Sequence, residues 1–112
     1  MIKVYIASPY TKGNKEENVK FQITIGDYLI NEGYAPFIPL LSHYQHIICP
    51  LSYDKWLELD FEWIKSCNCL LRLQGISKGA DLEVEFAKKN NIKVFYSITD
   101  LCNFYKEGVC NE

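Results

Sequence analysis

The sequence predicts an α/β fold in which a mainly parallel sheet of four or five strands is flanked by helices in three layers. Short β-branched and aromatic runs alternate with helix-like segments along the whole chain, which is the order typical of such sheets. Each interior helix lies between two strands, so right-handed crossovers can join them. With 112 residues, 48% of them hydrophobic, the chain suffices for one core. We therefore expect residues 1–112 to form a single domain.

The predicted elements follow in order along the chain. Buried strands are expected at residues 3–7, 35–38, 69–73 and 92–96. Helices are expected at residues 15–31, 53–66, 79–90 and 99–106. Asn14 can cap the first helix and Gly33 can stop it. The spacing predicts that its buried stripe comprises Val19, Ile23, Gly26 and Ile30. The arrangement is of the Rossmann- or flavodoxin-like kind.

Residues 39–52 form the least regular stretch, with two prolines and the only histidines, His43 and His46. Long irregular loops in compact domains are often functional. We expect a loop beside a pocket, in which either histidine can reach a ligand and Tyr44 or Phe37 can stack on an aromatic one. The alternative is a connection without a binding role.

The composition excludes several classes of function. A formal net charge of -2 and a pI near 5.7 argue against binding to nucleic acid polymers or anionic membranes. The five cysteines lack zinc-like spacing, so we expect no metal and no cofactor. The chain shows neither a signal-peptide pattern nor an apolar run of about 20 residues. A cytoplasmic protein with reduced thiols is the expected class.

Two acidic residues occupy positions where apolar residues are expected. On a helical wheel of residues 79–90, Glu83 falls among Ala80, Val84 and Ala87, opposite the charged face. Asp60 falls near the centre of the apolar arc of the preceding helix. Burying an unpaired carboxylate costs several kcal/mol, so such groups are paired, protonated or catalytic. Each acid alone can be a structural cap or ion-pair partner, but two acids flanking one strand favour a shared site.

The turn before Glu83 adds a possible anion site. Residues 75–79 follow a strand and open a helix, at the carboxyl end of the sheet where α/β folds bind ligands. Free N–H groups at a helix start attract anions, and Ser77 can cap the helix or donate its hydroxyl. A simple N-cap without a ligand is the alternative reading.

These residues together resemble those of the nucleoside 2-deoxyribosyltransferase superfamily, which includes the 2'-deoxynucleoside 5'-phosphate N-hydrolases. The resemblance rests on residues 4–9 in the first strand, residues 56–73 in the middle, and residues 77–83 with Ala87 after them. It implies cleavage or transfer at the N-glycosidic bond of a (2'-deoxy)nucleoside or its 5'-monophosphate. It also implies a homodimer or larger assembly. A non-catalytic nucleotide-binding or sensing module on the same fold is the alternative.

The resemblance implies roles for individual residues. Glu83 corresponds to the nucleophile, Asp60 to the acid that assists the leaving base or orients the sugar, and Tyr5 to a tyrosine that contacts the nucleophile or sugar. Ser77 and Gly79 correspond to the loop that binds the 5' side. The expected substrate-binding residues are Ser8, Pro9, Tyr10, Lys12, His43, Ser77 and Gly79.

The substrate's 5' group is the open question. Relatives that act on free nucleosides often carry an acid near Ser77, and a serine beside Lys78 suits a phosphate better because a carboxylate would repel it. However, Ser8 and Pro9 stand where phosphate hydrolases commonly carry glycine and serine. The sequence favours the nucleotide and leaves the nucleoside possible.

Overall fold

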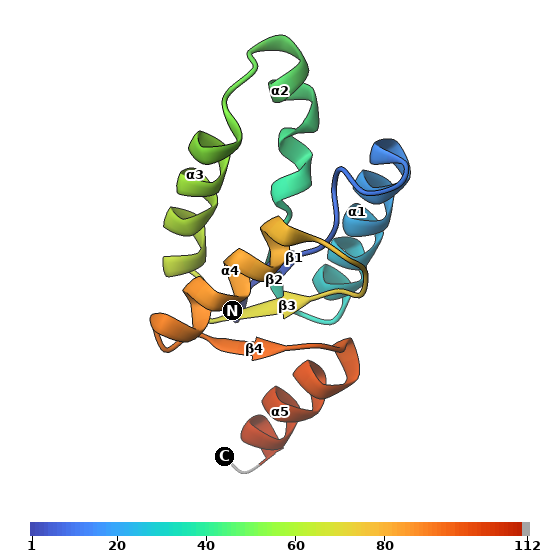
Figure 1. Ribbon diagram of the computed structural model, residues 1–112. Helices are drawn as coiled ribbons and strands as arrows, with labels where there is room; N and C mark the ends of the chain where they lie inside the picture. The colour runs from blue at the N-terminus through green and yellow to red at the C-terminus, as the bar shows by residue number, and fades with distance from the viewer. Residues whose placement is uncertain (111–112) are drawn as a thin grey trace.

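The computed structural model describes residues 1–110, and side chains as far as Lys106 (Figure 1). Its sheet has four parallel strands in the order β2-β1-β3-β4. Their bounds are β1 Lys3–Ala7, β2 Ala35–Phe37, β3 Cys69–Arg72 and β4 Lys93–Phe95. The predicted parallel α/β fold is therefore confirmed, with each strand at its expected place in the chain.

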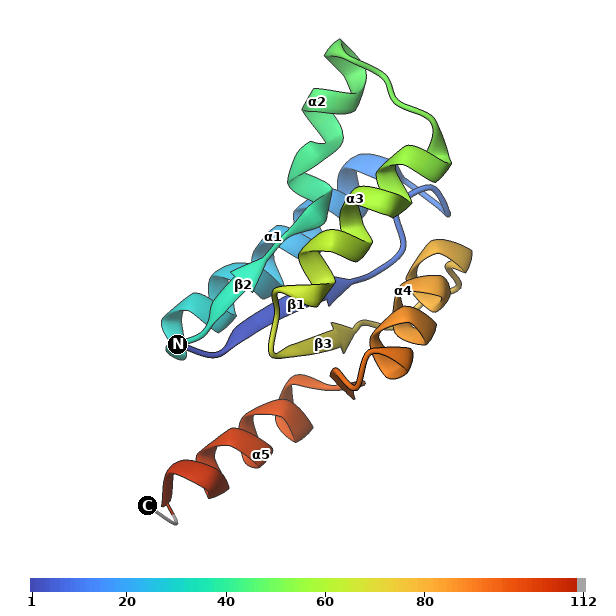
Figure 2. The same cartoon turned by 90° about the vertical axis from the view of Figure 1, so that its left-hand side faces the viewer.

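Helices cover both faces of the sheet, as Figures 1 and 2 show. The helices are α1 Lys15–Asn31, α2 His43–Ile48, α3 Tyr53–Lys65, α4 Lys78–Lys89 and α5 Ile98–Cys110. Alternation along β1 divides the core between the faces, because successive side chains of a strand point to opposite sides. Val4 and Ile6 share one core cluster with residues of α1 and α5. Tyr5 and Ala7 share the other with residues of α3 and α4. Tyr5 is thereby directed towards the helix that carries Glu83.

The stretch 39–52 is more regular than predicted. A 3-10 turn at Pro39–Ser42 leads into the short helix α2, which stands out at the opposite end of the molecule from α5 (Figures 1 and 2). The prediction of an irregular loop was wrong because the two prolines flank the helix and do not interrupt it. Pro39 occupies the beginning of the 3-10 turn, where its missing N–H is not needed.

The predicted buried stripe of α1 was also wrong in part. Gly26 is buried, but Ile23 and Ile30 are 38% and 56% exposed. The helix instead buries Gln22, Gly26 and Leu29. The apolar pattern misplaced the stripe because a polar residue, Gln22, is fully buried.

Gln22 is fully buried and connects three segments. Its amide nitrogen donates to the Ser8 hydroxyl at 2.7 Å, and its carbonyl oxygen accepts from the Leu40 N–H at 2.9 Å. It therefore holds the segment after β1 and the 3-10 turn against α1. Both segments border the cavity described below.

We predict that Gln22→Leu lowers the free energy of unfolding by about 1–3 kcal/mol, because it leaves the Leu40 N–H and the Ser8 hydroxyl without their partner. Urea unfolding monitored by circular dichroism measures the change. The same replacement at exposed Gln45 serves as the control and should cost less than about 0.5 kcal/mol. Equal effects at both positions would contradict the role of the buried amide.

Candidate active site

A cavity of about 400 Å³ lies beyond the carboxyl ends of β1 and β3, between α2, α3 and the first turns of α4. The chain leaves β1 towards β2 on one side and leaves β3 towards β4 on the other, so this is the topological switch point of the sheet. Open α/β sheets bind ligands at such points. The volume is within the usual range of small-molecule sites.

The cavity brings together most of the predicted site residues. Those that line it are Ser8, Tyr10, Lys12, His43, Asp60, Ser77, Gly79 and Glu83. Tyr5 is fully buried behind Glu83 and does not line the cavity. Pro9 does not line it either, because its ring packs against Gly75. The structure therefore places Tyr5 in contact with the predicted nucleophile, and Pro9 in a supporting position.

Glu83 is buried at 7% exposure and receives a hydrogen bond from the Tyr5 hydroxyl. Burial raises the pKa of Glu83 well above its usual range, and the negative charge of Asp60 raises it further. The hydrogen bond from Tyr5 and the charge of Arg72 oppose this change. Burial, followed by the two carboxylates, also raises the pKa of Tyr5, so its phenol stays neutral and donates.

Asp60 lies on α3 and faces the same end of the cavity as Glu83. Burial raises its pKa to about 6, and hydrogen bonding from Glu83 and Tyr5 lowers it in part. Two carboxyl groups this close do not both ionise readily, so the pair retains a proton at a pH at which separate carboxyls would both be charged. Burial acts on both carboxyls and the charge of Asp60 raises the pKa of Glu83 further, so the two groups titrate as a pair that shares this proton.

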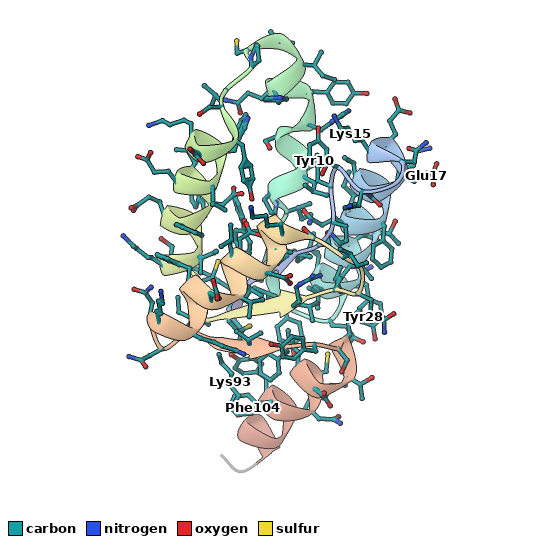
Figure 3. The ribbon with its side chains drawn as sticks, viewed as in Figure 1. Tyr10, Lys15, Glu17, Tyr28, Lys93 and Phe104 are labelled. Atoms are coloured by element: carbon teal, nitrogen blue, oxygen red, sulfur yellow. The ribbon has the colours of Figure 1, made fainter. Side chains whose placement is uncertain are left out.

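Two histidines of α2 border the cavity, each bonded to an aromatic side chain. His43 Nδ1 lies 2.6 Å from the hydroxyl of Tyr10, which is located between β1 and α1 (Figure 3). His46 Nδ1 accepts from Trp56 Nε1 of α3 at 2.7 Å. These bonds tie α2 to both of its neighbours. Because Trp56 can only donate, Nδ1 of His46 carries no proton.

The first turn of α4 has the geometry predicted for an anion site. Ser77 caps the helix, since its hydroxyl accepts from the Ala80 N–H at 3.1 Å. The N–H groups of Lys78 and Gly79 precede the first intrahelical bonds and remain for a ligand or water. A side chain on Gly79 would meet the Tyr53 hydroxyl at 3.3 Å, so the glycine permits a close approach of α3. Lys12 and Lys78 add positive charge at the rim, above the buried acids.

Several cavity residues were not predicted. Tyr53, Trp56 and Leu57 of α3 line it. His46, one of the two histidines expected beside a pocket, lines it as well. Trp56 precedes Asp60 by four residues, and this spacing places both on one face of α3. Neither predicted stacking residue lines the cavity. Phe37 stacks between Tyr5 and Trp63, with ring centroids 5.6 and 4.8 Å away, and Tyr44 is 73% exposed.

Within residues 1–110, no group of three or more potential metal-binding side chains is close enough together to hold an ion. None of the described helices is long and apolar enough to cross a membrane. The four cysteines whose side chains are described are free thiols.

In sequence, residues 2–97 match the family described as a domain of unknown function, DUF7768. The chain belongs to this family. No curated protein matches it in sequence. Among solved structures, it is similar to a 2-deoxyribosyltransferase from the psychrotolerant bacterium Bacillus psychrosaccharolyticus, characterised as a biocatalyst for the synthesis of nucleosides. The similarity has a TM-score of 0.60 at 20% identity and covers 82% of this chain and 69% of that chain. This DUF7768 chain therefore shares the fold of that enzyme.

We predict that Glu83→Gln raises Tm at pH 8 but leaves it nearly unchanged at pH 4. Folding raises the pKa of both carboxyls, so their protonated forms favour the folded state, and this stability is lost as pH rises from about 4 through 6 and above. A neutral amide at residue 83 avoids the part of this loss that comes from Glu83. Thermal unfolding across pH measures it, with exposed Glu85→Gln as the matched control. At each pH the change in Tm is taken relative to the wild type. A change that is more negative at pH 8 than at pH 4 would contradict the prediction.

Proposed function

We propose that this DUF7768 protein cleaves or transfers the N-glycosidic bond of a (2'-deoxy)nucleoside or its 5'-monophosphate, with Glu83 as nucleophile. The observation that carries the proposal is the pair of carboxyl groups, buried Glu83 and half-buried Asp60, in a nucleoside-sized cavity. A binding module gains nothing from two buried acids that share a proton, since their burial costs stability. The fold shared with a 2-deoxyribosyltransferase supports the same chemistry.

In the first step, the Glu83 carboxylate attacks the anomeric carbon and the bond to the base breaks. The bonding electrons go to the base nitrogen, and the proton of Asp60 neutralises the leaving base. This step needs the proton that the pair shares to be transferred to Asp60, which leaves the negative charge on Glu83. A bound base next to Asp60 favours that transfer, while the Tyr5 hydroxyl stabilises the Glu83 carboxylate.

In the second step, water or a second base attacks the anomeric carbon and releases Glu83 as a carboxylate. Asp60 takes the proton that the attacking group loses, so the pair returns to its initial state. Water as acceptor makes the protein a hydrolase, and a free base makes it a transferase.

We further propose that the 5' end of the substrate lies at the first turn of α4 and carries a phosphate. Ser77, the N–H groups of Lys78 and Gly79, and the Lys78 ammonium provide donors and positive charge at this end. The base then lies towards α2, where Tyr10, His43 and Trp56 offer aromatic and polar contacts.

A cytoplasmic location and assembly into homodimers or larger species complete the proposal. Large apolar side chains of the α2 region support self-association, because Leu41 and Ile48 are 60% and 76% exposed. Light scattering that finds only monomers at micromolar concentration would refute the assembly.

We predict that Glu83→Gln reduces base release by at least about 10³-fold, and that Asp60→Asn reduces it by about 10²–10⁴-fold. Chromatography of mixed nucleosides and 5'-monophosphates, with and without an added free base, measures release and transfer. Glu85→Gln, on the exposed side of the same helix, should keep wild-type activity. Full activity in folded Glu83→Gln would refute its role, and ligand-induced stabilisation of the wild type without any base release would favour the non-catalytic binding module.

We predict that Ser77→Asp raises KM for the 5'-monophosphate by about 10–100-fold while changing that for the free nucleoside by less than about threefold. Aspartate keeps the helix cap but adds a charge that repels phosphate. Ser77→Asn keeps the cap without the charge and serves as the matched control. Equal effects of Ser77→Asp on both substrates would refute the phosphate position.

A further inference from the structure

Arg72, the last residue of β3, joins three consecutive parts of the chain. Its guanidinium donates to the backbone carbonyls of Leu73 and Gly75, the latter at 2.8 Å, and to the Asp81 carboxylate of α4 at 3.0 Å. The arginine side chain is only 11% exposed. The planar guanidinium presents several donors in fixed directions, so one residue satisfies all three acceptors.

The segment that Arg72 holds leads directly into the site. Residues 73–77 connect β3 to α4, and Ser77 and Gly79 line the cavity. Gly75 has a φ of +120°, and a side chain there would lie 2.6 Å from the Pro9 ring. The loop is therefore fixed from one side by Pro9 and from the other by the guanidinium. Arg72 itself does not line the cavity.

Arg72 also acts on Glu83 through its charge. The charged and titratable groups that face Glu83 are Asp60 and Tyr53 of α3, Tyr5 of β1, and Arg72. Of these, Asp60 raises the pKa of Glu83, whereas Arg72 lowers it. Substitution at Arg72 therefore separates two effects, because lysine keeps the charge and loses the planar set of donors.

We propose that Arg72 is a positioning residue that holds residues 73–77 and the first turn of α4 in the one arrangement that places Glu83 and the Ser77 turn around the same ligand. The proposal rests on the proposed function, since it explains how the nucleophile Glu83 and the 5' site at Ser77 keep their relative positions. Arg72 acts through these residues and does not touch the substrate.

The test compares Arg72→Met, Arg72→Lys and Asp81→Asn by kcat, KM and the pH profile of base release. We expect Arg72→Met to lower kcat by about 10²-fold and to move the acidic limb of the profile to higher pH, because a displaced nucleophile reacts slowly and Glu83 loses a stabilising charge. Arg72→Lys should lower kcat by about tenfold with the limb unmoved. Asp81→Asn, which keeps both carbonyl bonds, should change kcat by less than about threefold.

The control is Lys89→Met, which removes a charge from the exposed side of α4 and should leave kcat and the profile unchanged. A folded Arg72→Met variant with kcat within twofold of wild type and an unmoved limb would overturn the proposal. If Arg72→Met does not fold, Arg72→Lys is the deciding variant. A kcat of Arg72→Lys equal to that of the wild type would then overturn the proposal.

Amide hydrogen exchange separates this proposal from the proposed function, because it needs no turnover. Arg72→Met, or Arg72→Lys in its place, should speed exchange in residues 73–80 by at least tenfold relative to Lys89→Met. If the wild type releases no base from any nucleoside, the proposed function fails, and faster exchange alone would still support the positioning role. Unchanged exchange would overturn it.

Discussion

The hydrogen bond from Tyr5 to Glu83 crosses a core face that is otherwise apolar and joins the central strand to α4. Without such a donor, Glu83 could be buried at low cost only in its protonated, uncharged form. Tyr5 can donate because alternation along β1 directs it to the α3–α4 side, while Val4 and Ile6 fill the opposite core. This pair adds a polar contact to the apolar packing of α4 on the sheet, at the end where the cavity lies.

Polar side chains hold the segments that carry the remaining site residues. Gln22 joins the Ser8 segment to the 3-10 turn, Arg72 holds the turn before α4, and the His43 and His46 bonds tie α2 to its neighbours. None of these contacts lies within a single helix or strand. The cavity is thus bordered by helices and loops whose arrangement on the sheet depends on a few polar side chains. Placing the two acids in this site lowers the stability of the folded protein at neutral pH.

The periodicity of apolar residues predicted those features of the structure that depend on a single helix or strand. The wheel placed Glu83 on the buried face of its helix, and the strand and helix order gave the parallel sheet. The residues it missed depend on contacts between distant segments. Gln22 is a polar residue, so the apolar pattern does not place it in the core. It is buried because Ser8 and Leu40 form hydrogen bonds with its amide, and the predicted stripe of α1 therefore fell on the wrong residues. Arg72 binds mainly backbone carbonyls, which leave no trace in the sequence. Trp56 lines the cavity one turn before Asp60, so the spacing of these two residues was the sequence signal for its place in the site.

The stereochemistry of transfer tests the central claim most directly, because a glutamate nucleophile requires two successive displacements at the anomeric carbon. With methanol as acceptor and a β-nucleoside or its monophosphate as donor, proton nuclear magnetic resonance reads the configuration of the methyl glycoside as it forms. The account predicts the β anomer, with retained configuration. Initial formation of the α anomer would show a single displacement and would contradict the assignment of Glu83 as the residue that accepts the sugar.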